Sequence, residues 1–273
     1  MTTSTPAQES TGSALTPHAP LTDYYRDEEE RHVYLRRIFD ETAPDYERTE
    51  RMAAFGSGAW YRRRALRRAG LGPGANVLDV GIGTGMVARE ALGLIGPSGH
   101  LAGVDPSAGM LAQVKLPGAE LVQGRAEQLP RPDASCDFLS MGYALRHVSN
   151  VDQAFAEFHR VLQPGGRVLV LEVTRPRTRF GLWMLKAWMR GLVPVLARLV
   201  TRHRATAELY RYYWDTIEAC IPPEQVMDAL RAAGFTDVQR FVELGMFSEY
   251  TATKAPAPPA GIPAATPATT PQT

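Results

Sequence analysis

Short apolar runs alternate with helical patterns through the middle of the chain. The runs cover residues 76–80, 101–104, 119–122, 136–140 and 167–173. Between them, apolar residues recur three or four positions apart, which is the spacing of one helix face. This alternation predicts an α/β fold, in which a doubly wound, mostly parallel sheet carries helices on both faces. Two further runs, at 236–241 and 246–253, predict an antiparallel hairpin that completes a sheet of about seven strands.

Helical spacing also marks the region before the first strand. In residues 23–70 it is shown by Tyr34, Leu35 and Ile38 and continues toward Leu66, so we expect a helical cover beside that strand. Further along, the segment 162–166 reads Leu-Gln-Pro-Gly-Gly. Proline and glycine cannot continue a helix easily, so this segment is expected to end a helix and turn the chain into the fifth strand.

The stretch 180–200 is the most apolar part of the chain. It nevertheless contains three cations and a proline, namely Lys186, Arg190, Arg198 and Pro194. A cation at the centre of a membrane costs about 2.5 to 3.5 kcal/mol, which disfavours a spanning helix. The pattern favours a pair of cover helices on the sheet, and we expect residues 177–218 as a whole to form lid helices of the domain. The alternative is an interfacial lid, in which Phe180, Trp183 and Trp188 enter lipid while the cations meet headgroups.

The two ends of the chain lack apolar periodicity. Residues 1–22 are rich in Thr, Ser and Pro, and residues 255–273 are almost wholly Ala, Pro and Thr. Such segments bury too little apolar surface to offset the entropy of ordering them. We therefore expect disordered tails on either side of one domain at 23–254. The N-terminus also lacks the basic and apolar regions of a secretory signal.

Composition and charge narrow the class of function. The chain has 273 residues, 44% of them hydrophobic, with 30 basic and 29 acidic side chains. This balance gives no field that would recruit nucleic acid, so small-molecule chemistry is expected. Cys136 and Cys220 are too few for a disulfide framework and lack the spacing of a zinc site. We expect a cytoplasmic protein, which would lie at the inner face of a membrane if 180–200 contacts lipid. Its oligomeric state is left open.

A glycine cluster lies where the first predicted strand meets the next helix. It reads Asp79-Val-Gly81-Ile-Gly83-Thr84-Gly85. Glycines at such a turn allow the backbone to approach a ligand, and the helix N-terminus offers free N–H groups. With Ala88, the last two glycines also satisfy a relaxed dinucleotide-binding pattern, so the glycines alone leave the cofactor open.

Two carboxylates change this picture. Asp79 stands at the strand tip, where it suits the cationic methionine end of S-adenosylmethionine and would repel a pyrophosphate. Asp105 ends the second strand, about twenty residues after the glycines, where it can accept hydrogen bonds from both ribose hydroxyls. The charge at Asp79 therefore favours S-adenosylmethionine, whereas Asp105 supports a ribose in either cofactor.

Several motifs occur in the order found in class I, Rossmann-like methyltransferases. After the glycine cluster come Asp105 with Met110-Leu111, Gly124-x-Ala126-Glu127-x-Leu129-Pro130, Tyr143-Ala144-Leu145-Arg146-His147-Val148 and Leu162-x-Pro164-Gly165-Gly166. Together they resemble the ubiquinone/menaquinone biosynthesis C-methyltransferase family. The resemblance also covers the entry segment 38–46, Phe55-Gly56, the segment 171–176 and Leu209-Tyr210-Arg211-Tyr212-Tyr213, so it extends over roughly 27–254.

The resemblance implies a set of cofactor contacts. They are Thr84, Asp105, Arg125, Ala126 and Gly142, in addition to the glycine cluster. The chain departs from the family at three positions. Arg125 stands where members commonly have Asp or Asn to accept a bond from the adenine amino group, and arginine has no acceptor. Gly142 replaces a common serine, and His147 replaces the asparagine of a Leu-Arg-Asn triplet.

For catalysis, the resemblance points to Arg146, which would order a water or stabilise a phenolate, and to Tyr46 as a substrate contact. His147 is an added candidate base because its unperturbed pKa is about 6.5. Each of the three also has a structural interpretation. Arg146 can form an ion pair, His147 can bond backbone at a helix start, and Tyr46 can belong to the core.

Methyl transfer is an in-line displacement in which the protein aligns the reactants and excludes water, so no metal is required. The first hypothesis is C-methylation of a quinol-type ring precursor, a small or lipid-soluble aromatic acceptor. The second is O- or N-methylation of another phenolic, natural-product or lipid acceptor. The third is a cofactor-binding protein without methyl transfer, or with another reaction on the same scaffold, because fold alone does not fix function.

Overall fold

A computed structural model describes residues 14–200 and 204–257 of the chain. It contains one sheet with strand order β3-β2-β1-β4-β5-β7-β6. The strands are β1 Asn76–Val80, β2 His100–Asp105, β3 Glu120–Gln123, β4 Cys136–Gly142, β5 Leu162–Val173, β6 Phe235–Glu243 and β7 Phe247–Lys254. Strands β1 to β5 are parallel, and β7 pairs antiparallel with both β5 and β6. The predicted sheet and its edge hairpin are therefore confirmed.

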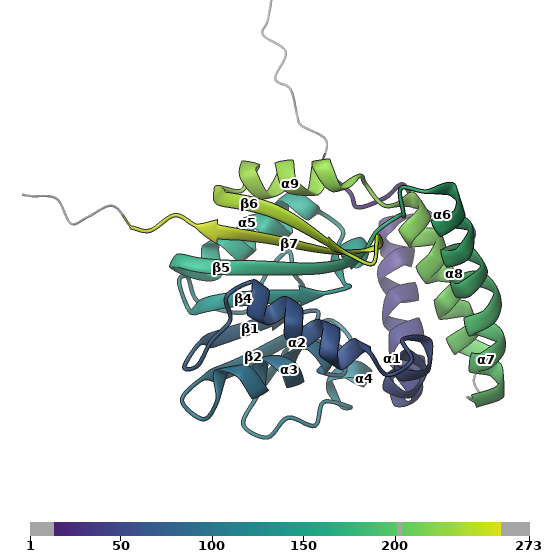
Figure 1. Cartoon of the computed structure of the whole chain (residues 1–273), viewed down its shortest axis with the longest axis horizontal. Helices are drawn as coiled ribbons and strands as arrows, with labels where there is room; N and C mark the ends of the chain where they lie inside the picture. The colour runs from purple at the N-terminus through teal and green to yellow at the C-terminus, as the bar shows by residue number, and fades with distance from the viewer. Residues whose placement is uncertain (1–13, 201–203, 258–273) are drawn as a thin grey trace, which may run out of the picture.

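Helices cover both faces of the sheet (Figure 1). On one face lie α5 Val151–Val161 and α9 Pro223–Ala232, which bury Phe155, Phe158 and Leu230 against the strands. On the other face lie α2 Gly58–Arg68 and α3 Met86–Ile95, which bury Leu66 and Ile95. The apolar stripes predicted from the sequence thus face the sheet from both sides, as a doubly wound fold requires.

Most of the remaining helices form a separate layer across the carboxyl ends of the parallel strands (Figure 1), whereas the short helix α4 Ala108–Leu111 follows β2. This layer contains α1 Glu28–Ala53, α6 Arg179–Lys186, the π-helical η2 Ala187–Leu192, α7 Val193–Val200 and α8 Arg204–Ala219. Helix α1 begins at Asp27, whose side chain accepts from the Glu30 N–H, and three glutamates fill its first turn. That arrangement satisfies free N–H groups and complements the helix dipole.

The segment 180–200 lies in this layer, so the interpretation as cover helices on the sheet is wrong. Leu185 packs with Trp214 and Ile217 of α8, and Val193 joins side chains of α1 and α8. The reason is that α5 and α9 already cover one face of the sheet, and α2 and α3 cover the other. No helix of the described residues is long and apolar enough to cross a membrane.

The N-terminal prediction also needs correction. Residues 14–25, which we call the N-terminal strap, are held in place although 1–22 was expected to be disordered. The Leu15 carbonyl accepts from the Val151 N–H, and the Pro17 carbonyl accepts from the Ile221 N–H. His18 is buried, with 6% of its surface exposed. Backbone pairing and buried rings, among them His18 and Tyr25, fix the strap without apolar periodicity. The other predicted tail residues, 1–13 and 258–273, lie outside the described residues.

The segment 162–166 differs from its prediction in one respect. Helix α5 ends at Val161, as expected, but β5 already begins at Leu162, which pairs with Cys136. The pairing then shifts before Arg167 meets Phe138. The proline and glycines therefore form an irregularity within the strand rather than a turn before it.

Candidate active site

The glycine cluster forms the turn between β1 and α3. Gly81, Gly83 and Gly85 have φ values of +68°, +56° and +87°, which favour glycine. A Cβ on Gly81 would lie 2.7 Å from the Ala144 Cβ, so the approach of the next loop also requires glycine. Gly81 and Gly83 line a cavity, whereas Gly85 caps α3 and Thr84 is buried beside it without lining that cavity. The turn thus exposes backbone at one wall of the cavity.

Asp105 joins this turn to the loop after β2. Its Oδ2 accepts from the Gly83 N–H at 2.8 Å and its Oδ1 from the Ser107 N–H at 2.9 Å. Burial raises the pKa of the Asp105 carboxyl to about 6, against the lowering effect of these two N–H groups. Each oxygen accepts one N–H and keeps a further lone pair for a ligand. The carboxyl lines the cavity, where a ligand with two adjacent hydroxyls can be held.

Asp79 lies behind the glycine turn and does not line the cavity. The Ser140 hydroxyl donates to its Oδ1 at 2.6 Å. Its Oδ2 is buried without a hydrogen-bond partner among the described residues. Burial raises the pKa of the Asp79 carboxyl to about 7, against the lowering effect of the Ser140 hydroxyl and the Ala88 N–H. A buried carboxyl beside a glycine turn, with one oxygen that no well-aligned donor reaches, fits a cationic ligand group.

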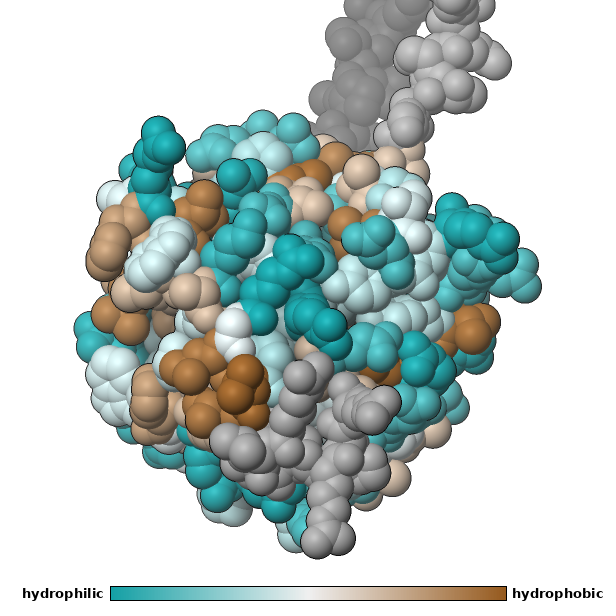
Figure 2. Space-filling view, turned by 90° about the vertical axis from the view of Figure 1, so that its right-hand side faces the viewer, coloured by the Kyte–Doolittle hydropathy of each residue, from teal (hydrophilic) through white to brown (hydrophobic). Residues whose placement is uncertain are grey.

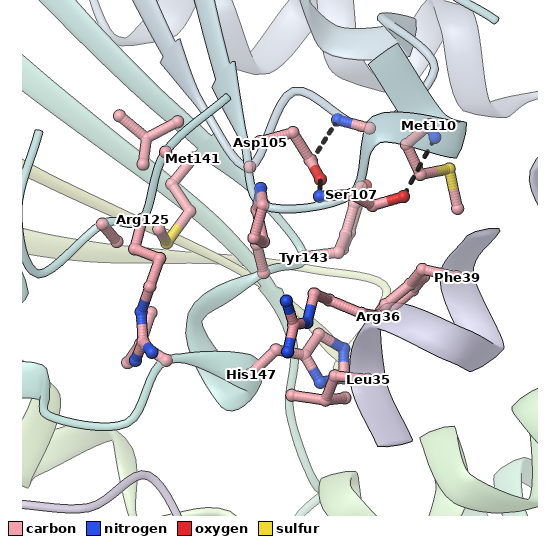
Figure 3. Close-up of a pocket in the computed structure, with 18 of the residues that line it drawn as sticks. Leu35, Arg36, Phe39, Asp105, Ser107, Met110, Arg125, Met141, Tyr143 and His147 are labelled. Atoms are coloured by element: carbon pink, nitrogen blue, oxygen red, sulfur yellow. Dashed lines mark hydrogen bonds between the residues drawn. The ribbon is translucent and has the colours of Figure 1, made fainter. Parts of the chain in front are cut away.

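The cavity has a volume of about 510 Å³, in the range of small-molecule sites. Figure 3 shows Asp105 and Ser107 on one side, His147 and Leu35 on the other, and Tyr143 between them. Of the predicted site residues, those that line it are Gly81, Gly83, Asp105, Arg125, Ala126, Gly142, Tyr46 and His147. Asp79, Thr84, Gly85 and Arg146 lie outside its lining. The carboxyl ends of β1, β2, β4 and their loops supply most of one wall.

Helix α1 supplies the opposite wall. Besides Tyr46, it contributes side chains that the sequence reasoning did not identify, namely His32, Leu35, Arg36 and Phe39. Asp40 fastens this helix to the loop after β2, since its Oδ1 accepts from the Ser107 hydroxyl and from the Gly109 N–H. The spacing of 32, 35, 36 and 39 is one helix face, which was the available signal.

Arg125 lines the cavity, but its guanidinium is directed to neighbours at the rim. It lies 2.8 Å from His32 Nε2 and donates to the Ser149 hydroxyl at 2.8 Å. A weaker contact of 3.4 Å joins it to Glu127.

Glycine is required at position 142 by close packing, because a Cβ there would lie 2.5 Å from Val87 Cγ2. Val87 of the helix after the glycine turn thus fills the space that a side chain at position 142 would need.

His147 is enclosed by rings. Its imidazole stacks on Tyr212, with centroids 5.7 Å apart, and meets Phe39 edge-on at 5.3 Å. Neither ring nitrogen has a hydrogen-bond partner among the described residues. Burial, with the charges of Arg146 and Arg31, lowers the pKa of His147 well below its usual value. It is therefore neutral near pH 7, with one nitrogen able to accept a proton or hydrogen bond. The predicted backbone bond of its side chain is absent from the described contacts.

Arg146 is fully buried in an ion pair with Glu172. Its guanidinium carbon also lies 4.9 Å from the ring centroid of Tyr213. The Tyr213 hydroxyl in turn lies 3.0 Å from that of Tyr46, and both tyrosines line the cavity. Arg146 thus contacts the lining residue Tyr213 without lining the cavity itself, in agreement with the ion-pair interpretation. Tyr46 is both a cavity residue and a neighbour of the aromatic core.

The loop that carries His147 is fixed from outside by two side chains. His18 Nε2 of the N-terminal strap lies 3.1 Å from the Arg146 carbonyl oxygen. Arg31 of α1 donates to the Val148 carbonyl at 2.8 Å. Sequence reasoning missed both residues, because neither belongs to a motif. Their contacts hold the short helix η1 Leu145–His147 against the cavity.

The chain resembles known proteins over most of its length. The sequence profile of the ubiE/COQ5 methyltransferase family matches residues 26–254. Demethylmenaquinone methyltransferase of Symbiobacterium thermophilum is 29% identical over 237 residues, which cover 83% of this chain and 94% of that protein. Ubiquinone/menaquinone biosynthesis C-methyltransferase UbiE of Hahella chejuensis is 32% identical over 213 residues, 75% of this chain and 84% of that one.

A solved structure agrees on the fold. A SAM-dependent methyltransferase of Thermotoga maritima superposes with a TM-score of 0.57 at 24% identity, covering 81% of this chain and 99% of that one. The family match confirms the expected donor as S-adenosylmethionine. The nicotinamide alternative, which the glycines alone allowed, is excluded by the family match. The chain belongs to the ubiE/COQ5 methyltransferase family and is an S-adenosylmethionine-dependent methyltransferase.

Proposed function

We propose that this enzyme methylates a ring carbon of a lipid-soluble quinol precursor. The observation that carries the proposal is the set of rings that line the cavity away from Asp105, which includes Phe39, Tyr143, His147 and Tyr213. Among the described lining residues the only carboxylates are Asp105, bound to two N–H groups, and Glu127, bound by Arg125 and the Ser149 N–H. An amine acceptor would lack a counter-charge there, whereas a neutral aromatic ring is well matched.

The chain has residues suited to hold the donor at the other end. We assign Gly81 and Gly83 to backbone contacts, Asp105 to the ribose hydroxyls and the buried oxygen of Asp79 to the cationic methionine end. When bound, S-adenosylmethionine supplies a methyl group already activated by a sulfonium. The protein's own task is then to orient the acceptor carbon and to exclude water. Helix α1 serves the second purpose, because its Leu35 and Phe39 line the wall of the cavity opposite the strand ends.

A quinol ring carbon becomes nucleophilic when a neighbouring hydroxyl gives up its proton. His147 is placed to accept a hydrogen bond from that hydroxyl, since it is neutral, lines the cavity and has unpartnered nitrogens among the described contacts. Its low pKa makes full proton transfer unfavourable before carbon attack, so we assign it a hydrogen bond that strengthens as the ring gains charge. The proton originally on the ring carbon leaves to solvent when the aromatic ring is restored.

The test uses three forms of one short-chain, water-soluble ring acceptor with labelled donor. The quinol should gain one methyl on carbon, located by mass spectrometry and NMR. The oxidised quinone and the quinol dimethyl ether should not react, because neither has a hydroxyl to deprotonate. Label on oxygen, or label on an amine but not on the quinol, would overturn the proposal.

Replacement of His147 isolates its contribution. We expect His147→Asn to lower kcat by about tenfold, equivalent to about 1.4 kcal/mol, while donor affinity measured by calorimetry stays unchanged. His32→Asn is the matched control, because His32 lines the cavity at the Arg125 rim instead of the aromatic end. Equal kcat in His147→Asn and the original enzyme would remove His147 from the mechanism.

A lipid-soluble acceptor also requires that the enzyme contact the membrane in which the acceptor is dissolved. Such acceptors reside in a membrane, so we include peripheral membrane contact through 180–200 in the proposed function. This is the interfacial interpretation of that stretch, and its exposed aromatic side chains support it.

A further inference from the structure

We infer that the helix run α6-η2-α7 forms a docking face for an anionic lipid bilayer. The inference rests on the lipid-soluble acceptor proposed above, and it adds the lipid charge and the residues that bind it. We define the docking face by its exposed apolar side chains, which are Phe55, Phe180, Trp183, Met184, Leu192 and Val195. Figure 2 views the molecule from the side of this helix layer and shows apolar patches among hydrophilic surface.

The exposed apolar side chains of this face follow a regular helical spacing, unlike apolar residues scattered singly over a protein surface. Phe180 is 70% exposed and Trp183 is 66% exposed, and their rings stack with centroids 6.2 Å apart. The exposed positions continue at helical spacing through Met184 to Val195, while Leu185 and Val193 face α8 and α1. A helix run that is apolar on both its buried and its outer side leaves the outer side unpartnered.

A second aromatic anchor comes from the end of α1. Phe55 is 83% exposed and has φ +49°, a conformation that is unfavourable for a bulky residue. Its ring lies 5.2 Å from that of Trp188 in η2, so it extends the same face. An aromatic side chain held outward in this way is suited to a membrane interface, where one side meets lipid and the other water.

The charge of this region selects the partner. Residues 173–207 contain eight Lys or Arg and no Asp or Glu, whereas the rest of the chain has 22 basic and 29 acidic residues. Lys186 and Arg190 are half-exposed, and each pairs with a carboxylate of α8, Lys186 with Glu218 and Arg190 with Asp215. Arg177 and Arg179, beside Phe180, are exposed without an ion pair among the described residues. This combination matches negatively charged headgroups and would repel a basic protein surface.

The docking face is also next to the acceptor end of the cavity, by which we mean the end lined by Phe39, Tyr143, His147 and Tyr213. Helix α8 packs Trp214 and Ile217 against the helix run, and its Tyr213 lines the cavity. Helix α8 therefore lies between the docking face and the cavity. An acceptor dissolved in the bilayer needs to pass only this layer to reach His147.

The experiment is flotation of the full chain with phosphatidylcholine vesicles, with and without phosphatidylglycerol, in low and high salt. We expect binding only to the anionic vesicles, and its loss in high salt. Arg177→Gln with Arg179→Gln should weaken binding by about fivefold per cation, or about 25-fold together. Phe180→Ser with Trp183→Ser should weaken it at least about tenfold. Leu121→Ser on β3 and Arg231→Gln on α9 are the controls, and both should bind as the original chain does.

Several outcomes would overturn the inference. They are no binding to anionic vesicles, equal binding to neutral ones, or unchanged binding by the Phe180 and Trp183 variant. A shift of that variant from dimer to monomer in sedimentation would assign the face to a second copy of the chain instead. Turnover of the water-soluble quinol should be the same in all docking variants. If no quinol is methylated but the vesicle results hold, the proposed acceptor fails and the docking face stands.

Discussion

The donor end and the acceptor end of the cavity are built by different means. At the donor end, backbone makes the wall, through the glycine turn and the N–H groups that Asp105 accepts. At the acceptor end, side chains of α1, α8 and the β4 loop make it, through Phe39, Tyr213 and His147. Backbone geometry tolerates little change, whereas side chains can be exchanged one at a time. The acceptor end is therefore where this chain can diverge from its relatives.

The two ends also differ in what supports them. Asp105 and Asp79 are held by the sheet and its first loops. His147 depends on a buried ion pair, a histidine of the N-terminal strap and an arginine of α1. A substitution outside the sequence motifs should therefore disturb the acceptor end more than the donor end.

The largest expected effect tests that support. Arg146→Ala leaves Glu172 as an uncompensated buried carboxylate, which costs about 3 to 5 kcal/mol. We expect a matching loss in the free energy of unfolding by urea. The double variant Arg146→Met with Glu172→Leu removes both charges and should recover most of that stability. If the single variant is as stable as the original chain, the ion pair does not support the loop.

The next effect tests the donor end. Asp105→Asn removes the charged acceptor and should weaken donor binding, measured by calorimetry, by about 1.5 to 3 kcal/mol, or roughly 10- to 150-fold. Asp228→Asn on α9 is the matched control, because Asp228 pairs with Arg231 outside the cavity lining, and it should leave donor affinity unchanged. Unchanged binding by Asp105→Asn would contradict its assignment to the ribose.

The difference between the two ends explains what the sequence could predict. Gly81, Gly83 and Asp105 belong to one strand-helix-strand unit, β1-α3-β2, so their spacing reports their geometry directly. The fold followed from the same local signals, because each apolar run fitted one strand. Gly142 needed the structure, since Val87 meets it only in three dimensions.

The acceptor end could not be predicted to the same extent. Its residues come from separate helices, and contacts such as that of His18 with the Arg146 carbonyl join positions 128 residues apart. No local pattern encodes such a pair. The sequence identified Tyr46 and His147 but placed Arg146 at the ligand, because a buried carboxylate partner such as Glu172 leaves no signature in the motif itself.

Donor binding should also depend on pH. The pKa values of Asp79 and Asp105, about 7 and about 6, lie above the usual range, so both carboxyls keep protons in mildly acidic solution. A cationic donor favours their ionised forms, so affinity should rise by about tenfold from acidic to neutral pH, with proton release. Calorimetry in buffers of different ionisation enthalpy measures that release. Asp79→Asn should flatten the upper part of the profile, and a flat profile in the original enzyme would contradict both assignments.

The smallest effect concerns Arg125, where the two ends meet. Its guanidinium is directed to His32 and Ser149 and is partly exposed, so Arg125→Ala should change donor affinity by less than about twofold. Arg125→Asn instead introduces an amide oxygen that can accept from the adenine amino group. One neutral hydrogen bond contributes about 0.5 to 1.5 kcal/mol, so donor affinity should rise by roughly two- to tenfold. Calorimetry with the two variants separates the cases. If Arg125→Ala loses as much affinity as Asp105→Asn, the arginine itself contacts the donor, and the donor end depends on side chains as much as the acceptor end does.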